Sequence, residues 1–498
     1  MFIKKMRFIA FTAAILPLML LALSCGGDAK TQDGKNGIVE EKNSEGEINE
    51  KAKKLQPDLP DGLDFGGEAF TFLVTGPDYG YGYYETKDIY AEAQNGETMN
   101  DAVYLRNRNV EDRLNINIAE QKSDNVAGDA KKLITSGDSS CDAIFAMMTE
   151  CATIAQANLL LNIKNMPHIG LDKPWWDKNA ERDLSIMNKL YFTTGDISTM
   201  VKLNTRILVF NKKLMRDFAL GSPYEYVKDD KWTFDVYAGM VKSVYTDVNG
   251  NGAYDDDDVY GTIMEGHNPF ILIRGFGERL TTNDETGYPQ ITCNNSRFFD
   301  AADKLWDLYF DERVCRSVSK MKKTGDYTNV YAYARSQLFS NDKFLFHLMC
   351  PDDMQELRNM ESDFGLLPCP KLDENQTRYY HVVDSQTVML CIPASCKDIN
   401  RAGVVLEAMA AESAYTVAPA LNETLLKRKY IRDDESEFVL GILDETRTYD
   451  LCVLFGWGGL DGAMNNLTTS KKRSLAAEIE KIYAKTEAAI AKTVSVFE

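Results

Sequence analysis

The sequence predicts an α/β protein built from two lobes, each with its own hydrophobic core. From residue 67 onward, short runs rich in β-branched and aromatic residues alternate with stretches of helical periodicity, as in a doubly wound α/β domain. This part of the chain is more than four hundred residues long. Because 44% of the whole sequence is hydrophobic, it can fill two cores.

The first five elements alternate as strand, helix, strand, helix and strand. Thr98 is placed to cap the first helix, and Asp101 suits its positive end. This order predicts the start of a parallel sheet. The five elements are expected at residues 69–76, 98–114, 115–120, 124–136 and 141–148.

A second unit begins near Leu190 and continues the alternation. Strands are expected at residues 190–195, 206–210, 259–264, 343–349, 364–367 and 381–392. Helices are expected at residues 211–219, 233–245, 296–310 and 327–339. The last 110 residues are mainly helical and close with a helix at 471–492, which carries one apolar stripe.

The N-terminus has the pattern of a secretory signal. Lys4, Lys5 and Arg7 precede an apolar run from Phe8 to Leu23, which is too short and wrongly flanked for a membrane span. The end of the run, residues 21–25 (LALSC), resembles the lipobox of bacterial lipoproteins, although Ala22 stands where that family more often has Leu. The resemblance implies a signal peptide at 1–24, lipidation of Cys25 and anchoring at the extracytoplasmic face of the cell membrane. A plain secretory signal is the alternative.

Residues 25–66 are predicted to form a tether after the lipidated cysteine. Residues 28–60 consist mainly of Lys, Glu, Asp, Asn, Gly and Gln, so they cannot bury enough apolar surface to fold. A flexible chain of this length reaches about 30 Å, which would hold a domain clear of the lipid headgroups.

The formal net charge of −19 argues against nucleic acid and against an anionic membrane surface as partners. Removal of the signal would take away three further positive charges. Nine cysteines follow Cys25, so a monomer would keep at least one free thiol. Several lie in apolar runs, where a free cysteine acts as a small hydrophobic residue, and we infer a reducing habitat while leaving disulfide pairing open.

The segment 247–258 fits a calcium-binding loop. Calcium needs six to eight hard oxygens within one short arc, and Gly252 provides the sharp turn at the sixth position. Asp258 stands where a glutamate is usual, so its shorter side chain would weaken the site. A metal-free acidic turn is the alternative. The expected ligands are Asp247, Asn249, Asn251, Ala253, Asp255 and Asp258.

Several strings resemble the family 1 extracellular solute-binding proteins of sugar ABC importers, which are relatives of maltose-binding protein. They are 173–176 (KPWW), 190–198 (LYFTTGDIS), 210–214 (FNKKL), 231–235 (KWTFD) with the acidic insert after it, and 258–261 (DVYG). The resemblance spans roughly residues 67 to 465.

This resemblance implies a two-lobed type II periplasmic-binding-protein fold with an inter-lobe cleft. The first lobe would comprise 67–204 plus about 389–430, and the second 205–388 plus about 431–498. It also implies a monomer that captures a small solute, most simply a mono- or oligosaccharide, and passes it to ABC transporter permease subunits.

Sugar binding requires apolar aromatic faces together with planar hydrogen-bonding groups at loop tips. In open α/β sheets, ligands lie at the carboxyl ends of the strands. Trp457 is added because glycines flank it, and Trp176 because it is one of two adjacent tryptophans. The full set of candidate ligand-binding residues is Tyr79, Tyr81, Met148, Thr149, Trp176, Asp196, Arg274 and Trp457.

The sequence offers no positive sign of catalysis. The four histidines are scattered, and no GxSxG or phosphate-loop motif is present. Two alternatives to a sugar-binding protein stay open. One is a surface carbohydrate-active enzyme, because the chain has many carboxylates from which a glycosidase pair could be formed. The other is a peptide or other small-solute binder on the same fold.

Overall fold

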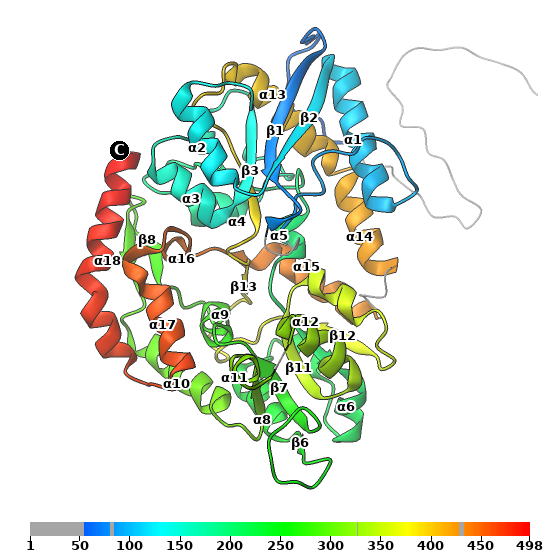
Figure 1. Cartoon of the computed structure of the whole chain (residues 1–498), viewed down its shortest axis with the longest axis vertical. Helices are drawn as coiled ribbons and strands as arrows, with labels where there is room; N and C mark the ends of the chain where they lie inside the picture. Colours follow the sequence, from blue (N-terminus) through cyan, green and yellow to red (C-terminus); the bar gives the residue numbers. More distant parts are fainter. Residues whose placement is uncertain (1–53, 80–83, 326, 428–432) are drawn as a thin grey trace, which may run out of the picture. The chain divides into compact units, whose positions relative to one another are not determined.

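The computed structural model describes residues 54–79, 84–325, 327–427 and 433–498. The predicted signal peptide, Cys25 and Tyr81 lie outside the described residues. From Leu55 onward the chain folds as one unit that contains two main β-sheets, one of five strands and one of six (Figure 1).

The first sheet has the order β2-β1-β3-β14-β4. Strands β1, β2 and β3 are parallel, which confirms the predicted parallel start, whereas β14 is antiparallel to both of its neighbours. Its strands are β1 (Glu68–Thr75), β2 (Ile116–Ser123), β3 (Ala143–Met147), β4 (Phe192–Thr193) and β14 (Val388–Cys391).

The second sheet has the order β10-β7-β11-β5-β12, with β6 pairing at the side of β7. Strands β10, β7 and β11 are parallel, and β5 is antiparallel to β11 and β12. Its strands are β5 (Ile207–Asn211), β6 (Tyr245–Thr246), β7 (Val259–Met264), β10 (Cys315–Ser317), β11 (Phe344–Met349) and β12 (Phe364–Leu367).

The two sheets exchange strands. After β4 the chain leaves the first sheet through residues 194–206 and enters the second as β5; after β12 it returns through residues 368–387 as β14. We call these two stretches the crossover segments. The predicted strand at 190–195 therefore belongs to the first sheet. The predicted strand at 381–392 is two strands, because a turn from Asp384 to Thr387 interrupts it.

Two small pairs of strands lie outside the main sheets. In the second crossover segment β13 (His381–Val382) pairs with β15 (Arg447–Thr448), and β8 (Thr281–Asn283) pairs with β9 (Pro289–Ile291). The β13–β15 pair ties the returning chain to the C-terminal region.

The first sheet is covered by helices from both ends of the chain. α13 and α14 pack on α1, and α2 and α3 pack on the strands (Figure 1). Glu97, not Thr98, is the residue before the first helical turn of α1, so the capping prediction was wrong by one position. The helices are α1 (Thr98–Leu114), α2 (Val126–Ser136), α3 (Met148–Gln156), α4 (Lys178–Leu184), α5 (Met200–Leu203), α13 (Ile399–Ser413) and α14 (Val417–Lys427).

The other helices surround the second sheet and the C-terminal region. The predicted helix at 327–339 is broken into α12, a π-helical turn at 334–338 and a 3-10 turn at 339–341. The helices are α6 (Lys212–Asp217), α7 (Pro223–Lys228), α8 (Phe234–Lys242), α9 (Asn268–Gly275), α10 (Ser296–Tyr309), α11 (Val318–Thr324), α12 (Val330–Tyr333), α15 (Asp434–Thr446), α16 (Leu451–Phe455), α17 (Leu460–Thr469) and α18 (Leu475–Phe497).

The predicted tether is shorter than expected at its C-terminal end. Leu59, Leu63 and Phe65 pack against the main hydrophobic core, and Leu55 donates its backbone N–H to the Tyr415 hydroxyl at 2.7 Å. Since these apolar side chains find a surface to bury against, the segment from Leu55 belongs to the folded unit.

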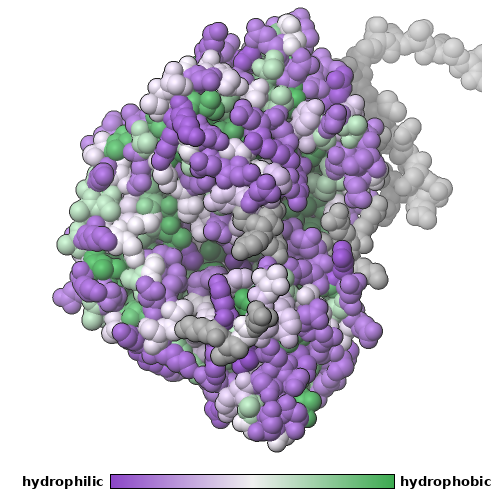
Figure 2. Space-filling view, in the orientation of Figure 1, coloured by the Kyte–Doolittle hydropathy of each residue, from purple (hydrophilic) through white to green (hydrophobic). Residues whose placement is uncertain are grey.

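Most of the surface shown in Figure 2 is hydrophilic, with apolar residues in small separate groups. No helix in the described ranges is both long and apolar enough to cross a membrane. The nine cysteines after Cys25 are all free, and only Cys396 among them is not buried.

A buried carboxylate fixes the double-tryptophan segment to α13. Glu407 is 1% exposed and accepts hydrogen bonds from the indole N–H groups of Trp175 at 3.1 Å and Trp176 at 2.8 Å, and from the backbone N–H of Gly170. A buried donor that loses its acceptor keeps the full cost of its desolvation.

We therefore expect Glu407→Ala to lower the free energy of unfolding by about 3 kcal/mol, because three buried N–H groups lose their acceptor. Glu407→Gln, which keeps one side-chain oxygen, should lose less. Denaturant unfolding measures both. Glu480→Ala, at an exposed position of α18, is the control, and a loss as large as that of Glu407→Ala would contradict the argument.

Candidate functional site

Loops at the strand ends of both sheets meet around the two crossover segments. Arg206, at the end of the first crossover, forms an ion pair with Asp384 of the second at 2.6 Å. Tyr84, in the loop after β1, lies near both, and it also lies near Asp353, which follows β11 of the second sheet. We call the region around these residues the inter-lobe site.

The first lobe contributes an aromatic and apolar wall. Tyr79 and Tyr84, both half-buried, pack against Met147, Met200 and Val388, which come from β3, α5 and β14. Burial raises the pKa of the Tyr84 phenol, and the nearby Asp384 carboxylate raises it further, so the hydroxyl stays protonated at neutral pH.

A buried pair of charged residues holds this wall in place. Asp88 accepts hydrogen bonds from the Ser198 hydroxyl at 3.0 Å and from the Thr199 hydroxyl at 2.8 Å. Arg106 of α1 donates to the backbone oxygens of Ile89 at 2.7 Å and Ile197 at 3.1 Å. These contacts join the loop that carries Tyr84 to the segment that carries Met200.

The second lobe contributes mainly charged groups. Glu265 follows β7 and binds His267 at 2.8 Å, which holds the pKa of this buried carboxyl at about 2. Arg335 donates two hydrogen bonds to Glu356, at 2.8 and 3.1 Å, and lies 3.4 Å from Asp353. The charges here are largely paired, as expected for groups shielded from water.

Two further side chains of the second lobe are available for a ligand. The Tyr331 ring on α12 is 37% exposed and lies near Glu265. Asp352 has no hydrogen-bond or ion-pair partner within the described part of the chain, and burial together with the adjacent Asp353 raises its pKa to about 6.

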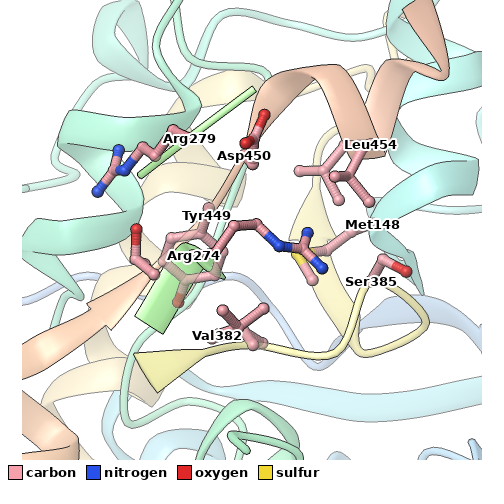
Figure 3. Close-up of a pocket in the computed structure, with 11 residues that line it drawn as sticks. Met148, Arg274, Arg279, Val382, Ser385, Tyr449, Asp450 and Leu454 are labelled. Carbon is pink, nitrogen blue, oxygen red and sulfur yellow. The ribbon is translucent and has the colours of Figure 1, made fainter. Parts of the chain in front are cut away.

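A hollow opens where the second crossover meets α3, α9 and α16 (Figure 3). We call it the hinge hollow. Arg274 lies on α9, Met148 begins α3, and Ser385 belongs to the crossover turn. In Figure 3 the Arg274 guanidinium extends between Met148 and Ser385, with Val382 beneath it. Elements of both lobes therefore line this hollow.

The structure brings three of the predicted ligand residues to these regions: Tyr79 lies in the aromatic wall, and Met148 and Arg274 line the hinge hollow. Thr149 follows Met148 on α3 and is half-buried. Asp196 lies in the first crossover, 3.9 Å from the Lys202 ammonium, and is half-buried.

The structure contradicts the two predicted tryptophans. Trp176 is 3% exposed and donates its indole N–H to Glu407, while Trp457 is 1% exposed and donates to the Thr493 hydroxyl at 2.8 Å. Trp457 also stacks on Phe455 with ring centres 5.2 Å apart. Of the flanking glycines, Gly458 allows a close approach to α18, since a Cβ there would collide with Thr486.

Sequence reasoning missed the residues that the second lobe contributes to the inter-lobe site. Glu265, Asp352 and Asp353 follow predicted strands, so the rule applied to the first lobe would have found them. Arg206 directly precedes a buried strand, but only the pairing of the crossovers shows its role. Tyr331 was hidden inside a predicted continuous helix.

The predicted calcium loop is closed by its own hydrogen bonds. Asp247 accepts the backbone N–H groups of Gly250 at 2.7 Å and Gly252 at 2.9 Å, and Gly252 has the expected left-handed conformation, with φ +72°. Asn251 donates to Asp255 at 2.8 Å. In the described ranges, no group of three or more His, Cys, Asp or Glu side chains is gathered as a metal site.

Two other acidic residues anchor this loop to the second sheet. Asp258 is fully buried and accepts the backbone N–H of Val248 at 3.2 Å. Asp256, which was not among the predicted ligands, binds Arg316 at 2.8 Å and the Tyr327 hydroxyl at 2.9 Å. The residues offer suitable oxygens, but a calcium ion would have to replace the Asn–Asp contacts to gather them.

No family model matches the sequence, and no curated protein matches it either. Solved structures do match. A sugar transporter from Rhizobium etli in an open conformation is similar at a TM-score of 0.57 and 12% identity, over 85% of this chain and 99% of its own. The chain has the fold of two-lobed solute-binding proteins.

Two further structures agree with this fold. A cyclo/maltodextrin-binding protein complexed with maltotetraose matches at a TM-score of 0.56 and 12% identity, over 85% of this chain and 97% of its own. An ABC substrate-binding protein from Listeria monocytogenes in complex with cycloalternan matches at a TM-score of 0.51 and 12% identity, over 85% of this chain and 99% of its own. The predicted type II periplasmic-binding-protein fold is thus confirmed, and the matched structures are transport or binding proteins.

Proposed function

We propose that the protein is the extracellular binding component of an ABC importer and that it captures a mono- or oligosaccharide in the inter-lobe site. The fold supports this, since structures with the same fold hold maltotetraose and cycloalternan. The ligand would favour the closed arrangement of the two lobes, and that arrangement would dock on the permease subunits.

The observation that carries the proposal is the composition of the inter-lobe site. Tyr79 and Tyr84 come from the first lobe and Tyr331 from the second. Arg206 and Asp353 lie near Tyr84, and Asp352 is adjacent to Asp353. Aromatic faces that pack on sugar rings, next to planar groups that bind hydroxyls, are what a saccharide requires.

We expect Tyr84→Ala and Tyr331→Ala each to weaken saccharide binding about tenfold, or roughly 1.4 kcal/mol, because each removes one aromatic face. Tyr226→Ala on α7, where the ring is 38% exposed, is the matched control and should bind normally. Isothermal titration calorimetry is the suitable measurement, because all five tryptophans are buried in the core and report poorly on the site.

The titrations should cover a panel of saccharides and short peptides. Binding of peptides but not of any saccharide would favour a peptide-binding protein and contradict the proposal. Release of smaller sugars from a glycan by the purified protein would favour the carbohydrate-active enzyme.

We also propose that Cys25 is lipidated and anchors the protein at the extracytoplasmic face of the cell membrane, with the segment before Leu55 as tether. The lipobox-like residues 21–25 support this. In cells fed an alkyne fatty acid, the wild-type protein should be labelled and Cys25→Ala should not. Equal labelling of both proteins would contradict the proposal.

Calcium binding by the loop 247–258 stays a separate proposal, supported by the spacing of its oxygen donors and by the conformation of Gly252. Millimolar calcium should raise the melting temperature, because an ion bound only to the folded state stabilises it. Asp247→Asn should abolish this rise. A melting temperature that does not respond to calcium in the wild-type protein would count against the site.

A further inference from the structure

The hinge hollow holds an arginine, Arg274, whose terminal nitrogens are not engaged within the described part of the chain. Arg274, in the last turn of α9, donates its Nε–H to the backbone oxygen of Phe270 at 3.2 Å. Neither of its Nη atoms has a hydrogen-bond or ion-pair partner among the residues that the structure describes. Its side chain is only half-buried, so the two free nitrogens are accessible from the hollow.

We propose that the ligand is an anionic saccharide whose acidic group binds the Arg274 guanidinium in the hinge hollow. This inference rests on the proposed function and names the class of sugar. The planar fork of a guanidinium matches a carboxylate or a sulfate through two parallel hydrogen bonds, and such charge-assisted pairs are the strong ones.

The carboxylate that lines the hollow, that of Asp450, forms its hydrogen bonds with groups other than Arg274. Asp450 accepts the backbone N–H groups of Leu280 at 2.7 Å and Cys452 at 3.0 Å, together with the Thr281 hydroxyl at 3.2 Å. These contacts occupy both of its oxygens; burial raises the pKa of this carboxyl, and the charge of Arg274 lowers it in part. The Asp450 carboxylate thus caps the N-terminus of α16 and forms no hydrogen bond or ion pair with Arg274.

The second arginine of the hollow is already paired. Arg279 forms an ion pair with Asp183 at 2.9 Å, and in Figure 3 its guanidinium points away from Arg274. Arg206 and Arg335, in the inter-lobe site, pair with Asp384 and Glu356. Of these four arginines, Arg274 is the one with neither Nη atom in an ion pair or hydrogen bond among the described residues.

The hollow is small, with about 10 Å³ of free space, so it admits one oxygen-sized group of an acidic sugar. Met148, Val382 and Leu454 are apolar and would shield an ion pair from water, while the Ser385 hydroxyl offers one further hydrogen bond. Since Met148 belongs to the first lobe and Arg274 to the second, an acidic group bound here would also join the two lobes.

One observation points the other way. Asp352 of the inter-lobe site has no partner in the described part of the chain, and an unpaired carboxylate would favour an amino sugar. The test must therefore compare acidic, neutral and cationic sugars that share one ring.

Isothermal titration calorimetry of the folded protein makes this comparison. The monosaccharides to test are glucuronate, glucose 6-sulfate, glucose and glucosamine, and the trisaccharides are trigalacturonate and maltotriose. We expect an acidic sugar to bind at least tenfold more tightly than its neutral counterpart. The glucuronate and glucose 6-sulfate titrations distinguish a carboxylate ligand from a sulfate ligand.

In Arg274→Gln the preference for the acidic sugar should disappear, while neutral sugars bind as before. Arg274→Lys keeps the charge but not the fork and should keep part of the preference. Arg216→Gln, at an exposed position of α6, is the matched control and should change nothing. Melting temperatures show whether each variant is folded.

Each other result overturns the inference. If neutral sugars or glucosamine bind best, or if Arg274→Gln and Arg274→Lys both keep the preference for the acidic sugar, Arg274 does not select the ligand and the proposed saccharide function still stands. If none of these sugars binds, the result counts against the proposed function as well.

Discussion

The exchange of one strand between two sheets is the constraint on which this structure depends. β5 is reached from the first sheet but pairs in the second, and β14 is reached from the second but pairs in the first. Each strand is buried in its host sheet and bonded to neighbours on both sides, so neither can be withdrawn without breaking a core. The crossovers must consequently run side by side.

This arrangement places polar groups where the loops of the two sheets meet. The Arg206–Asp384 pair joins the crossovers, and residues that follow β1, β7 and β11 gather around it. Charges held partly away from water need partners, and most of them have one. Asp352 and the terminal nitrogens of Arg274 have no such partner among the described residues, and under the proposed function they are groups from which a ligand would gain binding free energy.

The sequence predicted regular elements well where local pattern and burial agree. The helix at 98–114 and the strands at 259–264 and 364–367 have the predicted bounds. The sequence-based prediction failed where contacts between distant residues override the local sequence pattern. Trp176 and Trp457 were predicted as binding residues, but their indole N–H groups find buried acceptors on α13 and α18.

The sequence by itself determined the alternation of elements and the two-lobed α/β fold class, because periodicity and strand ends are local properties. Only the tertiary structure decided which strands cross between the sheets, which aromatic side chains are accessible and which charges are paired among the described residues. Those depend on contacts between residues far apart in the chain, such as Arg206 with Asp384 and Asp450 with Leu280, and no local pattern encodes them.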